Sequence, residues 1–343
     1  MPTRIGKYTL QLDKAPGILG FASVAGKKEK EGPLGAFFDV SHTDNTLGDV
    51  SWEKAESQLQ TEAVQTALKK AALEGKDVDY ILAGDLLNQC ISSTFGLRSL
   101  GIPFLGQYGA CSTMAQTLGL ASLFVETGIA RRAVAVTSSH FCSAERQFRF
   151  PLEYGGQRTP TAQWTATAAG SVVVGAHGRG EVKINAVTFG RIADLGIKDA
   201  NNMGAAMAPA AAQTLHDYLT DTGASPSDYD LILTGDLGAV GCELMDEILE
   251  KDGIDIREIH NDCGLMIYER QAQDVHAGGS GCGCSAAVLC SIILRQLSSG
   301  ELKKVLFIGT GALMSTTSSQ QGESIPGIAH LVFLESQAKW PSL

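Results

Sequence analysis

The sequence predicts a duplicated α/β fold built as five layers, α/β/α/β/α. Three observations lead to this prediction. A short apolar stretch that ends in Gly-Asp-Leu occurs twice, a second pair of similar segments follows in the same order, and the helical stretches of that second pair are apolar nearly all round. Helices that are apolar on every side are buried, and strands that are apolar throughout belong to sheets covered on both faces. The 343 residues are long enough for two related halves.

The first repeated unit is a helix followed by a strand. Residues 78–86 read VDYILAGDL and residues 229–237 read YDLILTGDL, so that Asp85 and Asp236 are related by an offset of 151 residues. Before each strand, apolar residues at three- and four-residue spacing predict a helix, over 55–73 in the first case and over 206–219 in the second.

The second repeated unit is a buried helix followed by a buried strand. The stretch ACSTMA at 110–115 opens a helical segment that stops at Gly128, and GCSAA at 283–287 opens another that stops at Gly300, an offset of 172 residues. The helices are predicted over 112–124 and 286–297, and the apolar strands that follow over 131–137 and 303–309. Two similar pairs in the same order indicate an internal duplication.

These elements divide the chain into two halves, residues 1–175 and 176–343. Right-handed crossovers through the helices would give two similar sheets with the apolar helices between them. Segments near 20–50 and 141–165 are richer in Gly, Pro and charged residues, and we interpret them as loop insertions on this frame.

Composition excludes several classes of function. The net charge of −10 disfavours nucleic-acid binding. No apolar stretch approaches the roughly 20 residues that cross a bilayer, and no leader opens the chain, so we expect a protein without a transmembrane segment. The eight cysteines are too sparse for a disulfide scaffold, and we interpret the Cys282-x-Cys284 pair as small residues in a glycine-rich turn. That glycine-rich run departs from G-x-G-x-x-G spacing, which argues against a dinucleotide site.

Cys111 is the first candidate functional residue, because it stands where a predicted loop meets the start of a buried helix. Free backbone N–H groups at a helix start favour thiolates and bound anions. Ser112 is the better helix cap by residue type. From position alone, Cys111 could equally be a small core residue.

A helix-opening cysteine in a duplicated α/β chain resembles the nucleophile of the thiolase superfamily, which includes thiolases and ketoacyl synthases. Three strings in the second half resemble thiolase motifs: NDCG beginning at Asn261 resembles Asn-Glu-Ala-Phe, HAGG beginning at His276 resembles Gly-His-Pro-x-Gly, and FIGTG beginning at Phe307 resembles Cys-x-Gly-Gly-Gly. Phe307 replaces the second cysteine of thiolases and cannot transfer a proton. Thiolase-type Claisen chemistry is therefore not expected, whereas acyl transfer through Cys111 with His276 and Asn261 stays open as an alternative.

Longer strings resemble the stage V sporulation protein AD family over nearly the whole chain. They are KEKEGPLG (28–35), AGDLLNQ (83–89), GACST (109–113), TSSH (137–140), ERQFR (145–149), MAPAAA (207–212), HNDCGLMIY (260–268) and GGSGC (278–282). The resemblance implies a thiolase-like fold and a non-catalytic role in spore formation: binding dipicolinic acid or its calcium chelate for uptake into the forespore. It also implies a homodimer, membrane-protein partners from the same operon, and a soluble or peripheral location at the inner spore membrane.

Dipicolinate is flat, aromatic and carries two carboxylates, so its site needs N–H or hydroxyl donors, an Arg fork and an apolar slot. We expect no resident cofactor or metal site, and calcium only as the ion chelated by the ligand. The expected ligand-binding residues are Cys111, Ser138, Ser139, His140, Arg149, Asn261 and His276.

Overall fold

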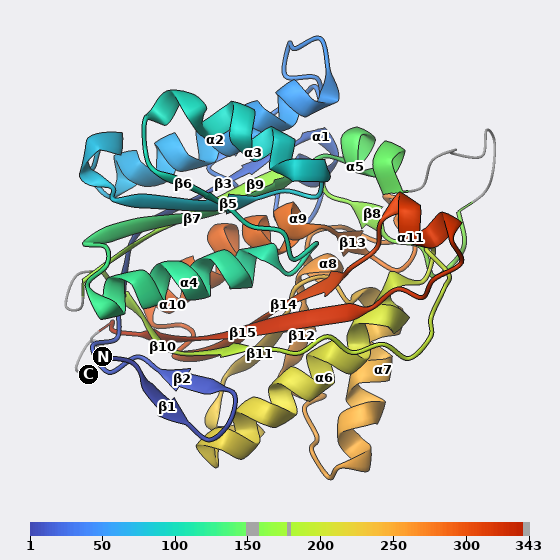
Figure 1. Cartoon of the computed structure of the whole chain (residues 1–343). Coiled ribbons are helices and arrows are strands. Elements are labelled where there is room, and N and C mark those ends of the chain that lie inside the picture. The colour runs from blue at the N-terminus through green and yellow to red at the C-terminus, as the bar shows by residue number, and fades with distance from the viewer. Residues whose placement is uncertain (149–157, 177–179, 339–343) are drawn as a thin grey trace.

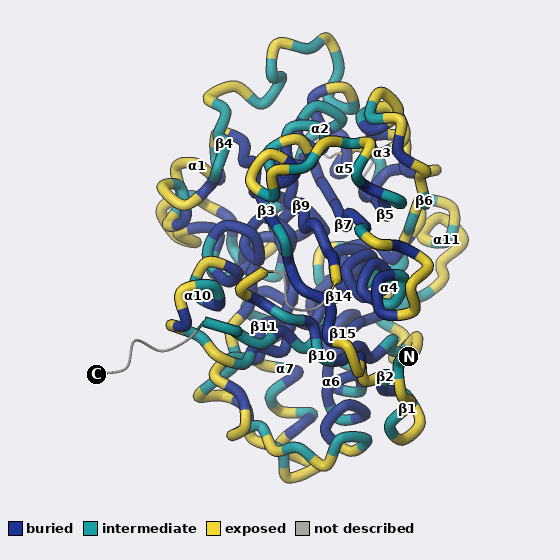
Figure 2. The backbone as a smooth tube through the Cα atoms, turned by 90° about the vertical axis from the view of Figure 1, so that its left-hand side faces the viewer, coloured by how far each residue is buried: buried dark blue, intermediate teal, exposed yellow. Residues whose placement is uncertain are grey.

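The computed structural model describes residues 1–148, 158–176 and 180–338. Two sheets lie between outer helices and enclose a central layer of helices (Figure 1). This arrangement is the predicted five-layer sandwich. Burial follows the layers, since the inner strands and the central helix α4 are dark along almost their whole length in Figure 2, whereas loops and outer helix faces are exposed.

Each sheet has five main strands joined in the same pattern. Three parallel strands are followed by two antiparallel ones. In sheet order, the first set is β6 (Phe104–Gly106), β5 (Tyr80–Gly84), β7 (Arg132–Ser139), β9 (Ala168–Gly175) and β3 (Gly17–Ala25), and the second set is β12 (His260–Asp262), β11 (Leu231–Thr234), β14 (Lys304–Ala312), β15 (Gly327–Ser336) and β10 (Val182–Phe189).

The two sets meet where β10 pairs with β3 in an antiparallel bridge. Short strands complete the sheets: β1 (Thr3–Ile5), β2 (Thr9–Gln11), β4 (Val40–Ser41), and the isolated parallel pair β8 (Trp164–Thr165) and β13 (Gly279–Ser280). The identical pairing pattern of the two sets is what the repeated motifs predict. The boundary at residues 175 and 176 stays a prediction.

Two helical segments fill the central layer. The first is α4 (Thr113–Thr127), and the second consists of α9 (Cys282–Val288), a π-helical stretch (Leu289–Ile293) and α10 (Leu294–Ser299). In the described part of the chain, the stretch Cys282–Ser299 is the one helix long and apolar enough to cross a membrane, but 72% of it is buried inside the fold. Its apolar character is therefore explained by its place between the sheets.

The outer layers cover the other faces of the sheets. Helices α2 (Trp52–Lys70) and α3 (Ile91–Leu97) cover the first sheet, and α6 (Met203–Thr222) and α7 (Gly238–Lys251) the second. Shorter helices are α1 (Lys27–Lys30), α5 (Phe141–Phe148), α8 (Cys263–Met266) and α11 (Thr316–Gln320).

Two glycines of β14 let the start of α4 lie directly against the second sheet. A Cβ atom on Gly311 would stand 2.5 Å from the Gly109 carbonyl oxygen, and one on Gly309 would stand 2.7 Å from the Ala115 Cβ. Real Cβ atoms essentially never approach another heavy atom this closely, so both positions require glycine. The glycines of the FIGTG string therefore serve helix packing, and they place Cys111 close to the second sheet.

Three local expectations differ from the structure. Residues 20–25 belong to strand β3, because small residues such as Gly20, which faces the Ala67 carbonyl, allow a strand to be buried on both faces. The segment 141–165 begins with helix α5 and ends in β8. Ser112 occupies the N-cap position of α4 as predicted, but its hydroxyl donates to the Gly109 carbonyl 2.7 Å away and makes no capping bond.

Candidate functional site

Cys111 lies in the turn that enters α4, two residues before the first helical residue. Ala110 has a left-handed backbone (φ 50°), which turns the chain so that the Cys111 side chain is buried against the second sheet. The next two backbone N–H groups donate within the turn, Ser112 to Gly109 O (3.1 Å) and Thr113 to Ala110 O (3.3 Å). The anion donors expected at this helix start are therefore already occupied at these two residues.

A small cavity of about 20 Å³ lies beside the Cys111 thiol. Its walls come from both halves of the chain, and its polar groups are the Cys111 thiol and two hydroxyls, of which the Ser280 Oγ lies 3.9 Å from the Cys111 Sγ. This volume holds about one water molecule. The lining residues are Leu86, Ala110, Cys111, Phe148, Thr165, Met203, Ser280, Ala312 and Met314.

Asp236 is fully buried next to Cys111 and Ser280, at the end of β11. Its carboxylate accepts hydrogen bonds from the Gly281 N–H (2.7 Å), the Ser280 hydroxyl (3.1 Å) and the Thr310 hydroxyl (2.8 Å). Burial raises the pKa of Asp236 to about 6 despite these donors. Burial and the Asp236 charge together raise the pKa of Cys111 well above its ordinary 9.0. The thiol is therefore protonated at neutral pH, which makes it a weak nucleophile.

The three predicted residues on and just after β7 point in different directions and do not line the cavity. Successive strand residues face opposite sides of a sheet. Ser138 accordingly faces α2, donating to Glu56 (3.0 Å) and accepting from Gln60 (3.0 Å), whereas Ser139 faces inward and donates to the Ala166 carbonyl (2.6 Å).

His140 is buried beneath the segment that precedes α2. Its Nδ1 accepts from the Cys142 N–H (3.2 Å), so Nε2 carries the proton and donates to the Asn45 carbonyl (2.8 Å). Burial lowers the pKa of His140, which keeps the ring neutral. The role of His140 is therefore structural, because its hydrogen bond holds the backbone of Asn45 in place.

The remaining predicted residues lie away from Cys111 or outside the described residues. Arg149 falls outside them. Asn261 is exposed on β12, where its Oδ1 accepts from the Asp262 N–H (2.8 Å). His276 is partly exposed, lies 3.3 Å from Asp274, and lines a polar surface cleft. Of the predicted residues that the structure describes, Cys111 alone lines the cavity.

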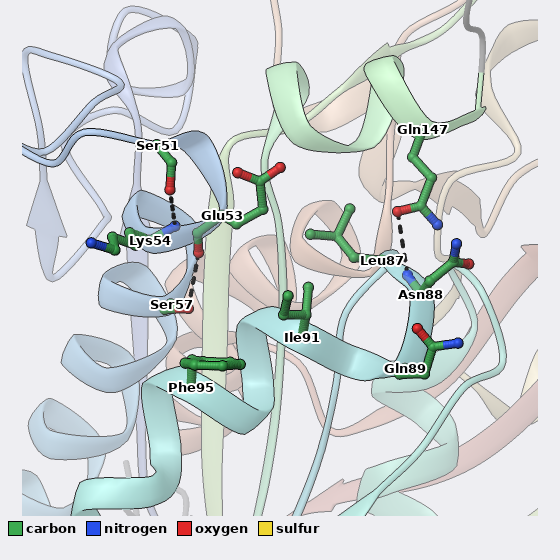
Figure 3. Close-up of a pocket in the computed structure, with 10 residues that line it drawn as sticks. All are labelled: Ser51, Glu53, Lys54, Ser57, Leu87, Asn88, Gln89, Ile91, Phe95 and Gln147. Carbon is green, nitrogen blue, oxygen red and sulfur yellow. Dashed lines mark hydrogen bonds between the residues drawn. The ribbon is translucent and has the colours of Figure 1, made fainter.

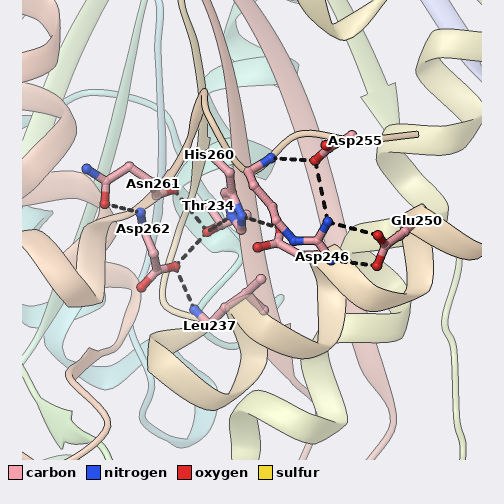
Figure 4. Close-up of polar contacts among 9 residues, drawn as sticks. Thr234, Leu237, Asp246, Glu250, Asp255, His260, Asn261 and Asp262 are labelled. Atoms are coloured by element: carbon pink, nitrogen blue, oxygen red, sulfur yellow. Dashed lines mark hydrogen bonds and ion pairs between the residues drawn. The ribbon is translucent and has the colours of Figure 1, made fainter. Parts of the chain in front are cut away.

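The carboxyl ends of β11 and β12 hold a separate polar network (Figure 4). His260 contacts Asp246 on α7 (2.8 Å) and Thr234 (3.1 Å), and the Thr234 hydroxyl donates to Asp262 (2.7 Å). Asp262 also accepts the N–H groups of Leu237 (2.8 Å) and Gly238 (3.1 Å), which begin α7. These contacts hold α7 against the sheet, so the polar residues of the HND string have a structural role.

The polar residues beside Cys111 that the sequence analysis missed are Asp236 and Ser280. A signal for Asp236 was present, because the repeated Gly-Asp-Leu places it at the end of a strand, where sites gather in α/β folds. Nothing local marks Ser280, since its role depends on Asp236, which is 44 positions away.

Two further buried carboxyls, Glu56 on α2 and Asp85 just after β5, lie close together. Glu56 accepts from Ser138 (3.0 Å) and from Ser143 on α5 (2.8 Å), and Asp85 accepts from the N–H (2.8 Å) and hydroxyl (2.6 Å) of Ser93. Burial and the neighbouring Asp85 charge raise the pKa of Glu56 from 4.5 to about 8. The folded chain therefore holds a proton on Glu56 that the unfolded chain releases at neutral pH.

This proton predicts a pH dependence of stability. Because the pKa of Glu56 is higher in the folded chain, its contribution is fully present below about pH 4.5 and is lost as the pH rises through about 8. The quantity to compare is the melting temperature at pH 9 minus the melting temperature at pH 5. In Glu56→Gln this difference should lie at least roughly 3 °C above its value in the wild type. Thermal unfolding by circular dichroism measures it, with Glu243→Gln on the exposed face of α7 as the control. Parallel pH profiles for the three proteins would contradict this prediction.

A duplicated five-layer sandwich with a buried cysteine before its first central helix is the structure of a thiolase-like protein. Two solved structures show this fold likeness: 3-oxoacyl-[acyl-carrier-protein] synthase III from Aquifex aeolicus (TM-score 0.58, 15% identity, 93% of this chain and 99% of that chain) and a variant of OleA from Xanthomonas campestris (TM-score 0.57, 13% identity, 97% and 99%). Within this class, the family described as Stage V sporulation protein AD matches residues 6–335. The Stage V sporulation protein AD of Bacillus subtilis is 48% identical over 330 residues, covering 96% of this chain and 97% of that protein. The chain belongs to the stage V sporulation protein AD family.

Proposed function

We propose that the protein binds dipicolinic acid, or its calcium chelate, for uptake into the developing forespore, on a thiolase-like scaffold that does not catalyse a reaction. The observation that carries the proposal is the family membership over nearly the full chain. Calcium enters as the ion chelated by the ligand. Among the residues that the structure describes, no three His, Cys, Asp or Glu side chains are grouped to hold a metal ion.

The chemistry around Cys111 supports a binding role. Leu86, Phe148 and Met314 give the cavity an apolar lining, and the hydroxyl groups of Thr165 and Ser280 are its polar groups, with their protons donated to Glu145 and Asp236. The cavity must widen beyond its volume of about 20 Å³ to take an aromatic ring.

The same chemistry argues against acyl transfer through Cys111, the alternative that the sequence left open. That reaction needs a base to take the thiol proton. The two partners that this alternative requires lie elsewhere, since His276 is by Asp274 and Asn261 is exposed on β12. Asp236 is the carboxylate beside the thiol, and it accepts from Gly281, Ser280 and Thr310 while its charge raises the pKa of Cys111. A non-catalytic scaffold is the simpler account of these contacts.

Titration calorimetry with dipicolinate tests the proposal. The wild-type chain should release or absorb heat on binding, with and without equimolar calcium. Ser280→Ala should weaken binding by about tenfold, because it removes one of the two hydroxyl groups that line the cavity. Ser299→Ala, which also removes a serine hydroxyl, is the matched control because Ser299 lies at the end of α10. No heat with the wild type would count against dipicolinate as the ligand, and release of CoA from acyl-CoA substrates would contradict the non-catalytic role.

We also propose that two copies pair through the edge strand β6 and that the dimer docks on membrane proteins of the same operon, peripheral to the inner spore membrane. β6 pairs with β5 on one side and ends the described sheet order on the other. Phe104 on β6 and Tyr108 just after it are exposed apolar side chains at this edge. Sedimentation velocity tests the dimer, and substituting Phe104→Glu should give a monomer of 36.1 kDa.

A further inference from the structure

A pocket much larger than the cavity at Cys111 lies at the surface of the protein (Figure 3). The surface pocket has a volume of about 490 Å³ and lies between the start of α2, the start of α3 and the end of α5. Leu87 and Gln147 line this pocket, and their chain neighbours Leu86 and Phe148 line the cavity. The wall between the two spaces therefore consists of the loop after β5 and the last turn of α5.

Helix α5 rests on Cys111 through a narrow apolar contact. Ala144 and Phe148, one helical turn apart, pack in the cluster that contains Leu86, Cys111 and Cys282. The helix is eight residues long, so few of its side chains reach the core. A short helix with so little buried apolar surface opens at low free-energy cost.

The other contacts of α5 are made by side chains. Ser143 donates to Glu56 on α2 (2.8 Å), and Glu145 accepts from Thr165 on β8 (2.9 Å). At the start of the helix, Phe141 stacks on Trp164 with ring centroids 3.9 Å apart. At its end, the Gln147 side chain accepts from the Asn88 N–H at 3.3 Å, a long hydrogen bond. Arg146 also pairs with Glu53 on α2, in an ion pair at the surface. The buried contacts of α5 are therefore made by residues 141–145, whereas residues 146 and 147 are held by surface contacts, which stabilise little. The end of the helix is the less firmly held part of the wall.

The surface pocket is large enough for a small-molecule ligand, whereas the cavity at Cys111 is not. About 490 Å³ is the size of a small-molecule site, whereas about 20 Å³ holds one water molecule. The surface pocket combines an apolar side, formed by Leu87, Ile91 and Phe95, with the carboxamide of Asn88 and the charged side chains of Glu53 and Lys54. Glu53 pairs with Arg146, which leaves Lys54 as the cation of the lining. Such a surface suits a small aromatic carboxylate, with its ring on Phe95 and its charge near the amides.

We propose that the surface pocket receives a small aromatic carboxylate first, and that the last turn of α5, with Phe148, moves aside to connect this pocket with the cavity at Cys111. The identity of the ligand rests on the proposed function. The movable wall does not, because it follows from the lining of the two spaces and the anchoring of α5.

Alkylation of Cys111 tests the wall without any ligand. The rate is measured for the full-length protein with iodoacetamide and peptide mass spectrometry, which separates Cys111 from Cys142 on α5. Phe148→Ala should raise the rate at Cys111 by about tenfold over wild type, since labelling follows the population of the open wall. Phe95→Ala is the matched control, because Phe95 lines the same pocket from α3 and is not part of the wall. Equal rates for the two variants would overturn the proposal.

A second variant keeps the proposal testable if Phe148→Ala fails to fold. Ser143→Ala removes the hydrogen bond to Glu56 and should raise the Cys111 rate by a smaller factor, with the buried Cys242 on α7 as the internal reference. A parallel rise at Cys242 would indicate general loosening and would overturn the local wall. Stopped-flow binding of dipicolinate adds the ligand arm: faster association in Phe148→Ala supports the route, and unchanged association overturns it. Faster alkylation without any dipicolinate binding would refute the ligand and leave the wall standing.

Discussion

Replacing Asp236 with Ala should lower the free energy of unfolding by about 3 kcal/mol, because the buried Gly281 N–H loses its acceptor and two hydroxyls lose theirs. Asp236→Asn keeps one carbonyl oxygen and should cost less than half as much. Urea denaturation followed by circular dichroism measures both variants.

Two further variants serve as comparisons for Asp236→Ala. Asp252→Ala, at an exposed position after α7, is the control and should change stability by less than about 0.5 kcal/mol. Asp85→Ala removes the equivalent aspartate of the first half, which accepts from the Leu87 (2.9 Å) and Ser93 (2.8 Å) N–H groups, and should destabilise as strongly. Similar denaturation midpoints for Asp236→Ala and Asp252→Ala would contradict the structural role of the buried carboxylate.

Replacing Phe307 with Ala should cost about 3–5 kcal/mol, the usual loss when a buried phenyl ring leaves a cavity. Phe307 is fully buried on β14 and packs into the main core cluster with Met114 and Leu118 of α4. The midpoint of urea denaturation measures this change, and Phe307→Leu should lose only part of it.

The control for the core position is Phe37→Ala, since that ring is 40% exposed. A Phe307→Ala effect no larger than that of Phe37→Ala would show that the ring does not contribute to packing. The expected result also bears on function. At the position that resembles the second catalytic cysteine of thiolases, this chain uses a core side chain that packs against the helix following Cys111.

The layers were predictable from the sequence because their signals are local and repeated. Apolar runs marked strands β5, β7, β11 and β14, and helices apolar on all sides marked the central layer. Strand β3 was missed because glycines and other small residues interrupt its apolar residues and weaken the strand pattern. Ser112 was taken for a helix cap, whereas its hydroxyl bonds back to the Gly109 carbonyl.

The candidate site was harder to predict than the fold. Cys111 was identified because its position at a helix start is visible in the sequence, and Ser138 and His140 were grouped with it because they follow the end of a neighbouring strand. The pleat of β7 turns Ser138 to the outer face, and His140 lies under residue 45. Adjacency along the chain does not decide which face a side chain takes unless the register of the sheet is known.

By itself, the sequence determined that this protein is a duplicated α/β sandwich with a cysteine at the start of a central helix, because periodicity and repeats are properties of neighbouring residues. Only the tertiary structure decided what surrounds that cysteine. Asp236 and Ser280 from the second half, and Phe148 from α5, approach Cys111 through contacts between distant segments. The pKa of Cys111, the volume of the cavity beside it and the wall that closes this cavity all depend on such contacts. No local sequence pattern encodes contacts between distant segments.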